Sequence, residues 1–236
     1  MRFSVVPLLL CAGGALTVLA HTHMRNLIID GDVKTRGKCI IPYKTNFSFP
    51  TKDLRSADLQ CRSSTMDLSD VESCPVKAGS TITMQWRQGE ENEGTVIQRQ
   101  HVGPCIVYMA RINPGISSYS WFKIFEDGYN QKWCVEKLIS NGGQDSRKIK
   151  PGEYLLRGEL IGLSEASRPY GKDMTSGAQF YANCARVQVS GTESGVPDNS
   201  QIAFFPGYYG TEQPGILFDI NKSPINYTIP GPKIFS

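Results

Sequence analysis

The sequence predicts an all-β fold, an immunoglobulin-like or fibronectin-type β-sandwich with long loops. Residues 81–87 alternate polar and apolar side chains without a break, which is the period of a half-buried strand. Glycine and proline separate the apolar runs, and no pattern of strands alternating with helices is present. The 236 residues are 40% hydrophobic and 20% charged, a composition that excludes a disordered, collagen-like or polytopic membrane chain.

Four segments have the composition and periodicity of strands: 81–87, 104–111, 153–163 and 185–190. The segments between them predict long loops at 31–76, 88–100, 126–150 and 191–218. Loops of this length in a compact domain are usually functional or held by disulfides. The sequence contains no internal repeat and no low-complexity tract that would lead to another module.

Residues 1–20 read as a secretory signal peptide, with Arg2, an apolar run and small or apolar residues before a cut after Ala20. We expect the processed chain, residues 21–236, to be one secreted, monomeric β-sandwich domain without an appended carbohydrate-binding module. The alternative is an uncleaved anchor helix, although the segment is short for a bilayer span. Removing one arginine leaves a charge of 24 − 22 = +2. This balance predicts neither a nucleic-acid nor a membrane partner.

The processed chain retains six cysteines, an even number that suggests disulfides in a secreted protein. Six cysteines allow fifteen pairings, and the sequence alone does not choose among them. No C-x-x-C motif is present, which argues against a zinc site. The tripeptides that begin at Asn46, Asn221 and Asn226 are acceptors for N-glycosylation, although Pro224 disfavours use of Asn221.

Cleavage after Ala20 places His21 at the N-terminus, where its α-amine and imidazole Nδ1 together chelate one metal ion. Nitrogen ligands in a tetragonal arrangement favour Cu(II). Taken alone, the simpler interpretation is that His21 is merely the residue after the cut. His101 precedes the strand at 104–111 and could supply a further nitrogen, although a lone histidine is more often structural.

Gln179 and Tyr181 lie two residues apart, so in a strand they share one face. That face continues as Ala185, Val187 and Val189, which predicts that it is directed to the core. Polar side chains at the inner end of an apolar row require hydrogen-bond or metal partners. The alternative is that both are core polar groups satisfied by the protein itself.

These features occur within segments that together resemble the fungal lytic polysaccharide monooxygenases of auxiliary activity family 9, once classified as glycoside hydrolases. The resemblance covers most of the processed chain and depends on the order and number of its pieces. The pieces follow in chain order. The first four are His21 and residues 27–31, residues 56–61, residues 78–86, and the motif His101-x-Gly-Pro together with residues 106–110. The others are residues 121–128, residues 151–157, the motif Gly177-Ala-Gln-Phe-Tyr181 together with Cys184-Ala185, residues 205–207, and residues 229–232.

The resemblance implies a copper ion held by the amine and one ring nitrogen of His21, by His101, and by Tyr181 in the axial position. It implies that Gln179 donates a hydrogen bond toward bound oxygen species, a placement that tunes reactivity. It also implies a disulfide between Cys61 and Cys184.

The implied activity is oxidative cleavage of β-1,4-linked glucans in plant cell walls, with cellulose as the first candidate and xyloglucan or another hemicellulose as the second. It uses O2 or H2O2 and an external electron donor, either a small molecule or a redox protein. A flat copper-bearing surface suits a crystalline substrate. Tyr208 and Tyr209 are the expected sugar-stacking aromatics, with ordinary loop residues as the alternative. We expect His23 to face the surface or the substrate rather than to bind metal.

One position departs from the family pattern. Ser164 stands where the family commonly has a histidine that handles protons beside the metal, and serine is not a cationic proton donor near neutral pH. This raises a second hypothesis, a copper-binding protein with weak or no cleavage of polysaccharide. A third is a carbohydrate-binding sandwich without copper, which the joint presence of His21, His101, Gln179 and Tyr181 disfavours.

Overall fold

The computed structural model describes residues 22–35, 37–43, 49–63, 66–88, 96–113, 118–140, 144–145, 150–173, 175–192 and 194–235. The predicted signal peptide, His21 and Asn46 lie outside these residues. In the described part of the chain, no helix is both long and apolar enough to span a membrane.

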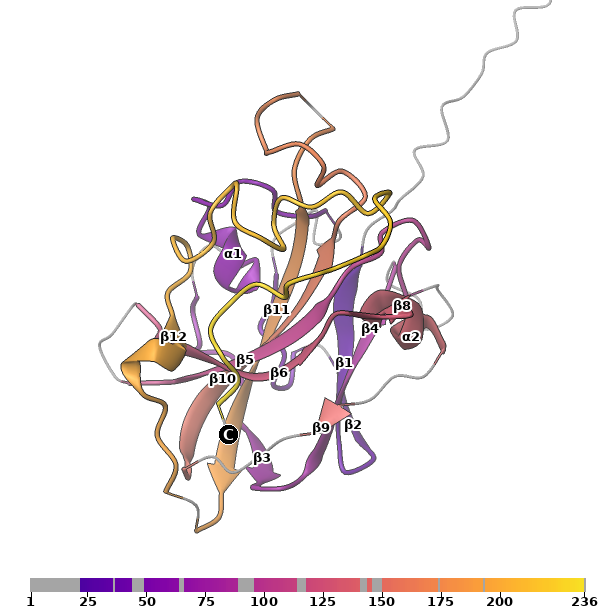
Figure 1. The fold of residues 1–236 in the computed structure, drawn as a ribbon. Helices are drawn as coiled ribbons and strands as arrows, with labels where there is room; N and C mark the ends of the chain where they lie inside the picture. The colour runs from indigo at the N-terminus through magenta and orange to yellow at the C-terminus, as the bar shows by residue number, and fades with distance from the viewer. Residues whose placement is uncertain are drawn as a thin grey trace, which may run out of the picture.

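Most of the regular secondary structure in the described chain belongs to two β-sheets (Figure 1). The four-stranded sheet has the order β2 (Asp32–Thr35), β1 (His23–Ile29), β4 (Thr81–Arg87) and β9 (Gln144–Asp145). The six-stranded sheet has the order β12 (Ile202–Ala203), β6 (Trp121–Asp127), β5 (Cys105–Arg111), β10 (Gly152–Gly162), β11 (Gln179–Ser190) and β3 (Cys74–Lys77). Among the named strands of the described residues, only the β11–β3 pair is parallel. A hairpin of β7 (Tyr129–Asn130) and β8 (Lys132–Trp133) lies beside them.

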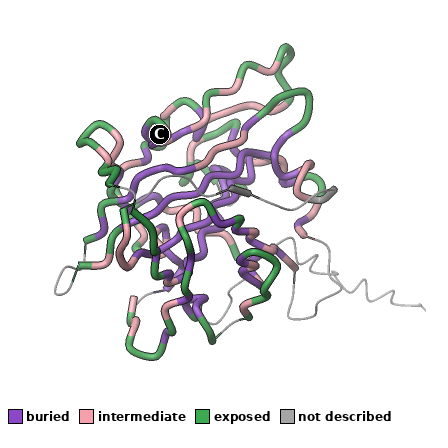
Figure 2. Tube along the Cα trace, turned by 90° about the horizontal axis from the view of Figure 1, so that it is seen from below, coloured by how far each residue is buried: buried purple, intermediate pink, exposed green. Residues whose placement is uncertain are grey.

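The core lies between the two sheets, as a β-sandwich requires. Alternation along β4 puts Ile82, Met84 and Trp86 in this core, which confirms the strand predicted from the pattern of residues 81–87. The six-stranded sheet is also covered on its outer face, where a second cluster includes Leu54, Leu59 and Phe205. Figure 2 shows the buried chain running through the centre of the molecule. Burial of both faces explains the nearly unbroken apolar run of β5, and in β10 the buried Arg157 and Glu159 form an ion pair with each other.

Several predicted boundaries differ from the structure, and the predicted loops contain the short strands β2, β7, β8, β9 and β12 and most of β3. β11 begins at Gln179, six residues before the predicted start at 185, because Phe180, Tyr181 and Ala182 continue its pairing with β10. The predicted loops contain short helices, α1 (Asp58–Cys61), α2 (Cys134–Ser140) and the 3₁₀ turn η1 (Asn199–Gln201). Their lengths give too few turns for a clear apolar period.

Three disulfides hold the long loops to the sheets. Cys61–Cys184 joins the end of α1 to the middle of β11, which agrees with the pairing that the family resemblance implied. Cys39–Cys74 and Cys105–Cys134 are the two pairs that the sequence left open. The Cys61–Cys184 bond thereby sets α1 against β11, and the loop between β10 and β11 projects at the top of Figure 1.

Candidate functional site

His101 lies where the chain enters β5, and backbone contacts with the end of β10 fix its position. The Leu163 N–H donates to the Val102 carbonyl oxygen over 2.9 Å, and the Ile161 N–H donates to the Pro104 carbonyl oxygen over 3.2 Å. A Cβ atom on Gly103 would lie only 1.8 Å from the Ile161 carbonyl oxygen, so this approach requires glycine. The local motif His-x-Gly-Pro thus holds the imidazole against the segment that follows β10.

The imidazole of His101 is buried and has one nitrogen with no hydrogen-bond partner among the described residues. Its Nδ1 lies 3.4 Å from the Ser164 hydroxyl oxygen. Its Nε2 is buried and forms no hydrogen bond with any described residue. Burial lowers the pKa of His101, and the carboxylate of Glu165 opposes that shift. The lowered pKa favours the neutral imidazole, which is the form that binds metal ions.

Tyr181 faces the same region and begins a chain of polar contacts. Its ring centroid lies 6.4 Å from that of His101. The Tyr181 hydroxyl donates to Gln179 Oε1 over 2.7 Å, and Gln179 Nε2 donates to a Glu165 carboxylate oxygen over 2.9 Å. Lys52 forms an ion pair with the same Glu165 oxygen. Both groups of the Gln179 amide are therefore held by partners, and its orientation is determined.

The shared face predicted for β11 is confirmed. Tyr181 belongs to the same buried cluster as Ala185, Val187 and Val189. Burial raises the pKa of the Tyr181 phenol, so the hydroxyl stays protonated at neutral pH. A protonated phenol that donates to Gln179 keeps its oxygen lone pairs free to face the region of His101.

Two residues that sequence reasoning missed hold the start of the described chain at this site. Asn183 Oδ1 accepts from the Met24 N–H over 2.9 Å at the beginning of β1. Arg62 donates to the Thr22 carbonyl oxygen over 3.2 Å, and its guanidinium lies over the Tyr181 ring at 5.2 Å. Burial lowers the pKa of Arg62 to about 10. Each is adjacent in sequence to a cysteine of the Cys61–Cys184 disulfide. Because the family resemblance implied this disulfide near Tyr181, that adjacency could have placed both residues near the site.

The expectations for His23 and Tyr209 are wrong. His23 is fully buried with its ring against Tyr43 at 5.3 Å, because β1 starts at His23 and turns its side chain inward. Tyr209 is also buried, and its hydroxyl donates to Glu159 over 2.7 Å and lies 2.8 Å from the Tyr108 hydroxyl. Neither side chain is at the surface, where a polysaccharide would contact it.

The other predicted positions lie in different environments. Tyr208 is partly exposed and packs edge-to-face against Phe205 and Tyr209. Asn221 and Asn226 are exposed on the C-terminal segment. Tyr170 is 44% exposed in the loop after Ser164 and Glu165, so it is an aromatic surface residue near the site that sequence reasoning missed.

Comparison with known proteins gives a single family. The model of auxiliary activity family 9, formerly glycoside hydrolase family 61, matches residues 21–227. An "AA9 family lytic polysaccharide monooxygenase A" of Armillaria gallica is 31% identical over 231 residues, which cover 96% of this chain and 92% of that protein. One of Aspergillus tamarii is 35% identical over 242 residues. The match covers 100% of this chain but 62% of the A. tamarii protein, so this chain spans less than two thirds of that relative.

Solved structures of similar fold have the same kind of description. The structure titled CvAA9A aligns with a TM-score of 0.79 and 30% identity, over 91% of this chain and 97% of the other. A "cellulose-active polysaccharide monooxygenase" from M. thermophila aligns with a TM-score of 0.71 and 27% identity, over 91% of this chain and 99% of the other. The predicted β-sandwich is thus confirmed by known folds.

Proposed function

Since the chain belongs to auxiliary activity family 9, the lytic polysaccharide monooxygenases, we propose that it is a secreted copper enzyme that oxidatively cleaves β-1,4-linked glucans. Cellulose is the first candidate substrate, and xyloglucan or another hemicellulose is the second. The co-substrate is O2 or H2O2, and the electrons come from an external reductant. Exposure of Asn221 and Asn226 is consistent with glycosylation during secretion.

The buried Nε2 of His101 is the observation that carries this proposal. A buried polar atom without a hydrogen-bond partner costs free energy, and a metal ion at this nitrogen would remove that cost. His101 Nε2 would hold copper together with the amine and one ring nitrogen of His21, and the Tyr181 oxygen would lie near the metal. Arg62 supports this assignment, because it ties Thr22, the residue after His21, to the ring of Tyr181.

Copper in such a site supplies the one-electron chemistry that activates O2 or H2O2 for attack on a C–H bond beside the glycosidic linkage. The surrounding residues hold the geometry. Gln179 keeps its amide fixed between Tyr181 and Glu165, and Lys52 holds Glu165 in place. The phenol of Tyr181 remains protonated because burial raises its pKa.

A second candidate function is copper binding with weak or no cleavage. The Ser164 hydroxyl lies 3.4 Å from His101 Nδ1, so serine takes the place beside the site where the family commonly has a proton-handling histidine. The hydroxyl is neutral at working pH and cannot supply a proton as an imidazolium does. This candidate predicts tight copper binding without soluble oxidised products.

The test is a product assay on the secreted, copper-loaded protein. Amorphous cellulose and xyloglucan are incubated with and without ascorbate, and the soluble products are analysed by mass spectrometry. Oxidised oligosaccharides that require ascorbate and are absent for His101→Ala establish the enzyme. A protein that binds one copper ion but gives no product from either glucan supports the second candidate. Equal product from His101→Ala contradicts the assigned site, since that product arises from adventitious copper.

A further inference from the structure

A cavity lies toward the opposite end of the six-stranded sheet from Tyr181. Its volume is about 320 Å³, within the range of cavities that hold small ligands. In the register of β10 with β11, Tyr154 pairs with Val187, whereas Leu160 pairs with Tyr181. Six residues of strand separate the two pairs, which corresponds to roughly 20 Å. The cavity is therefore separate from the candidate copper site.

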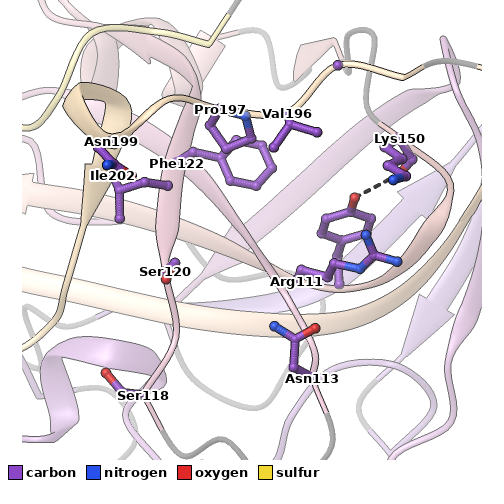
Figure 3. Close-up of a pocket in the computed structure, with 12 residues that line it drawn as sticks. Arg111, Asn113, Ser118, Ser120, Phe122, Lys150, Val196, Pro197, Asn199 and Ile202 are labelled. Carbon is purple, nitrogen blue, oxygen red and sulfur yellow. Dashed lines mark hydrogen bonds between the residues drawn. The ribbon is translucent and has the colours of Figure 1, made fainter.

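One wall of the cavity is apolar and aromatic. Phe122 of β6 packs edge-to-face with Tyr154 of β10, with ring centroids 6.3 Å apart. Val196 and Pro197 close the same side, and Val196 is 68% exposed (Figure 3). Phe122 and Tyr154 are themselves buried, so the apolar surface that this wall leaves open to a flat ring comes mainly from Val196.

Beside Tyr154, the cavity carries two positive charges. Figure 3 shows Arg111, from the end of β5, and Lys150, from the segment before β10, on one side of the cavity. Within the described part of the chain, neither side chain forms an ion pair, and no acidic residue lines the cavity. The Tyr154 hydroxyl donates to the Lys150 carbonyl oxygen over 2.8 Å, which fixes the backbone there. Asn113, Ser118 and Ser120 add neutral polar groups to the rim.

We propose that this cavity binds a small aromatic carboxylate, such as a hydroxylated benzoate. The planar fork of Arg111 matches a carboxylate, with Lys150 adding charge, while the ring lies against Val196 and the lining edges of the buried Phe122 and Tyr154. The neutral rim accommodates a ring hydroxyl. A uronic acid shares the carboxylate but presents hydroxyls to the apolar wall, so the observations favour the aromatic acid.

The test measures binding of 4-hydroxybenzoate to the copper-loaded protein by titration calorimetry and saturation-transfer NMR. Matched probes are 4-hydroxybenzamide, which lacks the charge, and glucuronate, which lacks the ring. We expect saturable binding of 4-hydroxybenzoate that is at least about tenfold tighter than binding of either probe. His101→Ala should bind 4-hydroxybenzoate equally well, which separates this cavity from carboxylate coordination at copper and keeps the result independent of the proposed enzyme activity.

Variants locate the site. Arg111→Ala should weaken binding at least about tenfold, because it removes the charge-assisted contacts, whereas Arg55→Ala, at an arginine whose side chain is 90% exposed, should not. Val196→Asp should also weaken binding by adding a negative charge at an exposed position without disturbing the core. Unchanged binding in both Arg111→Ala and Val196→Asp would overturn the proposal. No binding of 4-hydroxybenzoate, or equal binding of glucuronate, would overturn it as well.

Discussion

Ser164 is the residue whose chemistry has most influence on whether this site cleaves polysaccharide. It contacts His101 from the segment that follows β10, so a side chain here reaches the candidate copper site. We predict that Ser164→His increases the rate at which ascorbate-dependent oxidised products form, because imidazole supplies a proton donor near neutral pH. Ser167→His, at an exposed position of the same loop, is the matched control.

The comparison of these two variants is made by mass spectrometry of soluble products at equal copper loading. No gain in Ser164→His over the original chain, or an equal gain in Ser167→His, would contradict a role for position 164 in proton handling.

Tyr209 is a second residue with a clear prediction, because its hydroxyl lies in a buried polar cluster with Tyr108 and Glu159. Tyr209→Phe leaves those partners short of a hydrogen bond, and it should lower the free energy of unfolding by about 1–3 kcal/mol. Glucan binding should be unchanged. Denaturant unfolding checks the stability, and a cellulose pull-down checks the glucan binding. Tyr208→Phe, at a partly exposed position, is the control. Loss of cellulose binding at unchanged stability would restore Tyr209 as a surface contact.

At the scale of elements, the segment that enters β5 packs closely against the end of β10, and Gly103 lies at the contact. A methyl group on Gly103 collides with the Ile161 carbonyl oxygen, which is backbone and cannot rotate away. We predict that Gly103→Ala destabilises the protein by roughly 1–3 kcal/mol and weakens copper binding by displacing His101. In Gly210→Ala the new methyl group meets nothing closer than 3.8 Å, so its melting temperature should stay unchanged. Equal melting temperatures for the two variants would contradict this account.

Elements with a strong period could be predicted from the sequence, and elements built on tertiary contacts could not. Strand β4 matches the predicted residues 81–87 because its two faces see different environments. Helix α2 lies in a predicted loop because its position depends on the Cys105–Cys134 disulfide and on Glu136, whose carboxylate accepts from the Trp133 N–H. No pattern in a single sequence encodes that pairing.

In the candidate site, too, some residues could be predicted from the sequence and others are placed by tertiary contacts. His101, Gln179 and Tyr181 could be selected by residue type and spacing, and they are brought together. The inward turn of His23 depends on where β1 begins, and the burial of Tyr209 depends on the Glu159 carboxylate beneath it. Arg62 and Asn183 act through contacts between segments far apart in the chain.

At the scale of the whole molecule, aspartates in tight turns contribute to the response to acid. Hydrogen bonds from hydroxyl and backbone N–H groups lower the pKa of five carboxyls: Asp30, Asp53, Asp67, Asp173 and Asp198. A lowered folded-state pKa stabilises the fold above the unfolded-state value near 4, and this stabilisation is lost as the pH falls through the lower folded-state values. We predict that the melting temperature falls steadily between about pH 4 and pH 2. A melting temperature that stays constant over this range would contradict the prediction.

Copper binding by the processed chain tests the central claim most directly. Three chains are titrated with Cu(II) and examined by EPR: one that begins at His21, one that begins at Ala20, and His101→Ala beginning at His21. The extra residue converts the His21 amine into an amide and removes one proposed ligand. We predict one tightly bound copper with nitrogen ligation in the first chain and affinities at least about 100-fold weaker in the other two. Equal affinity and identical spectra for all three chains would contradict a site built from the His21 amine and His101.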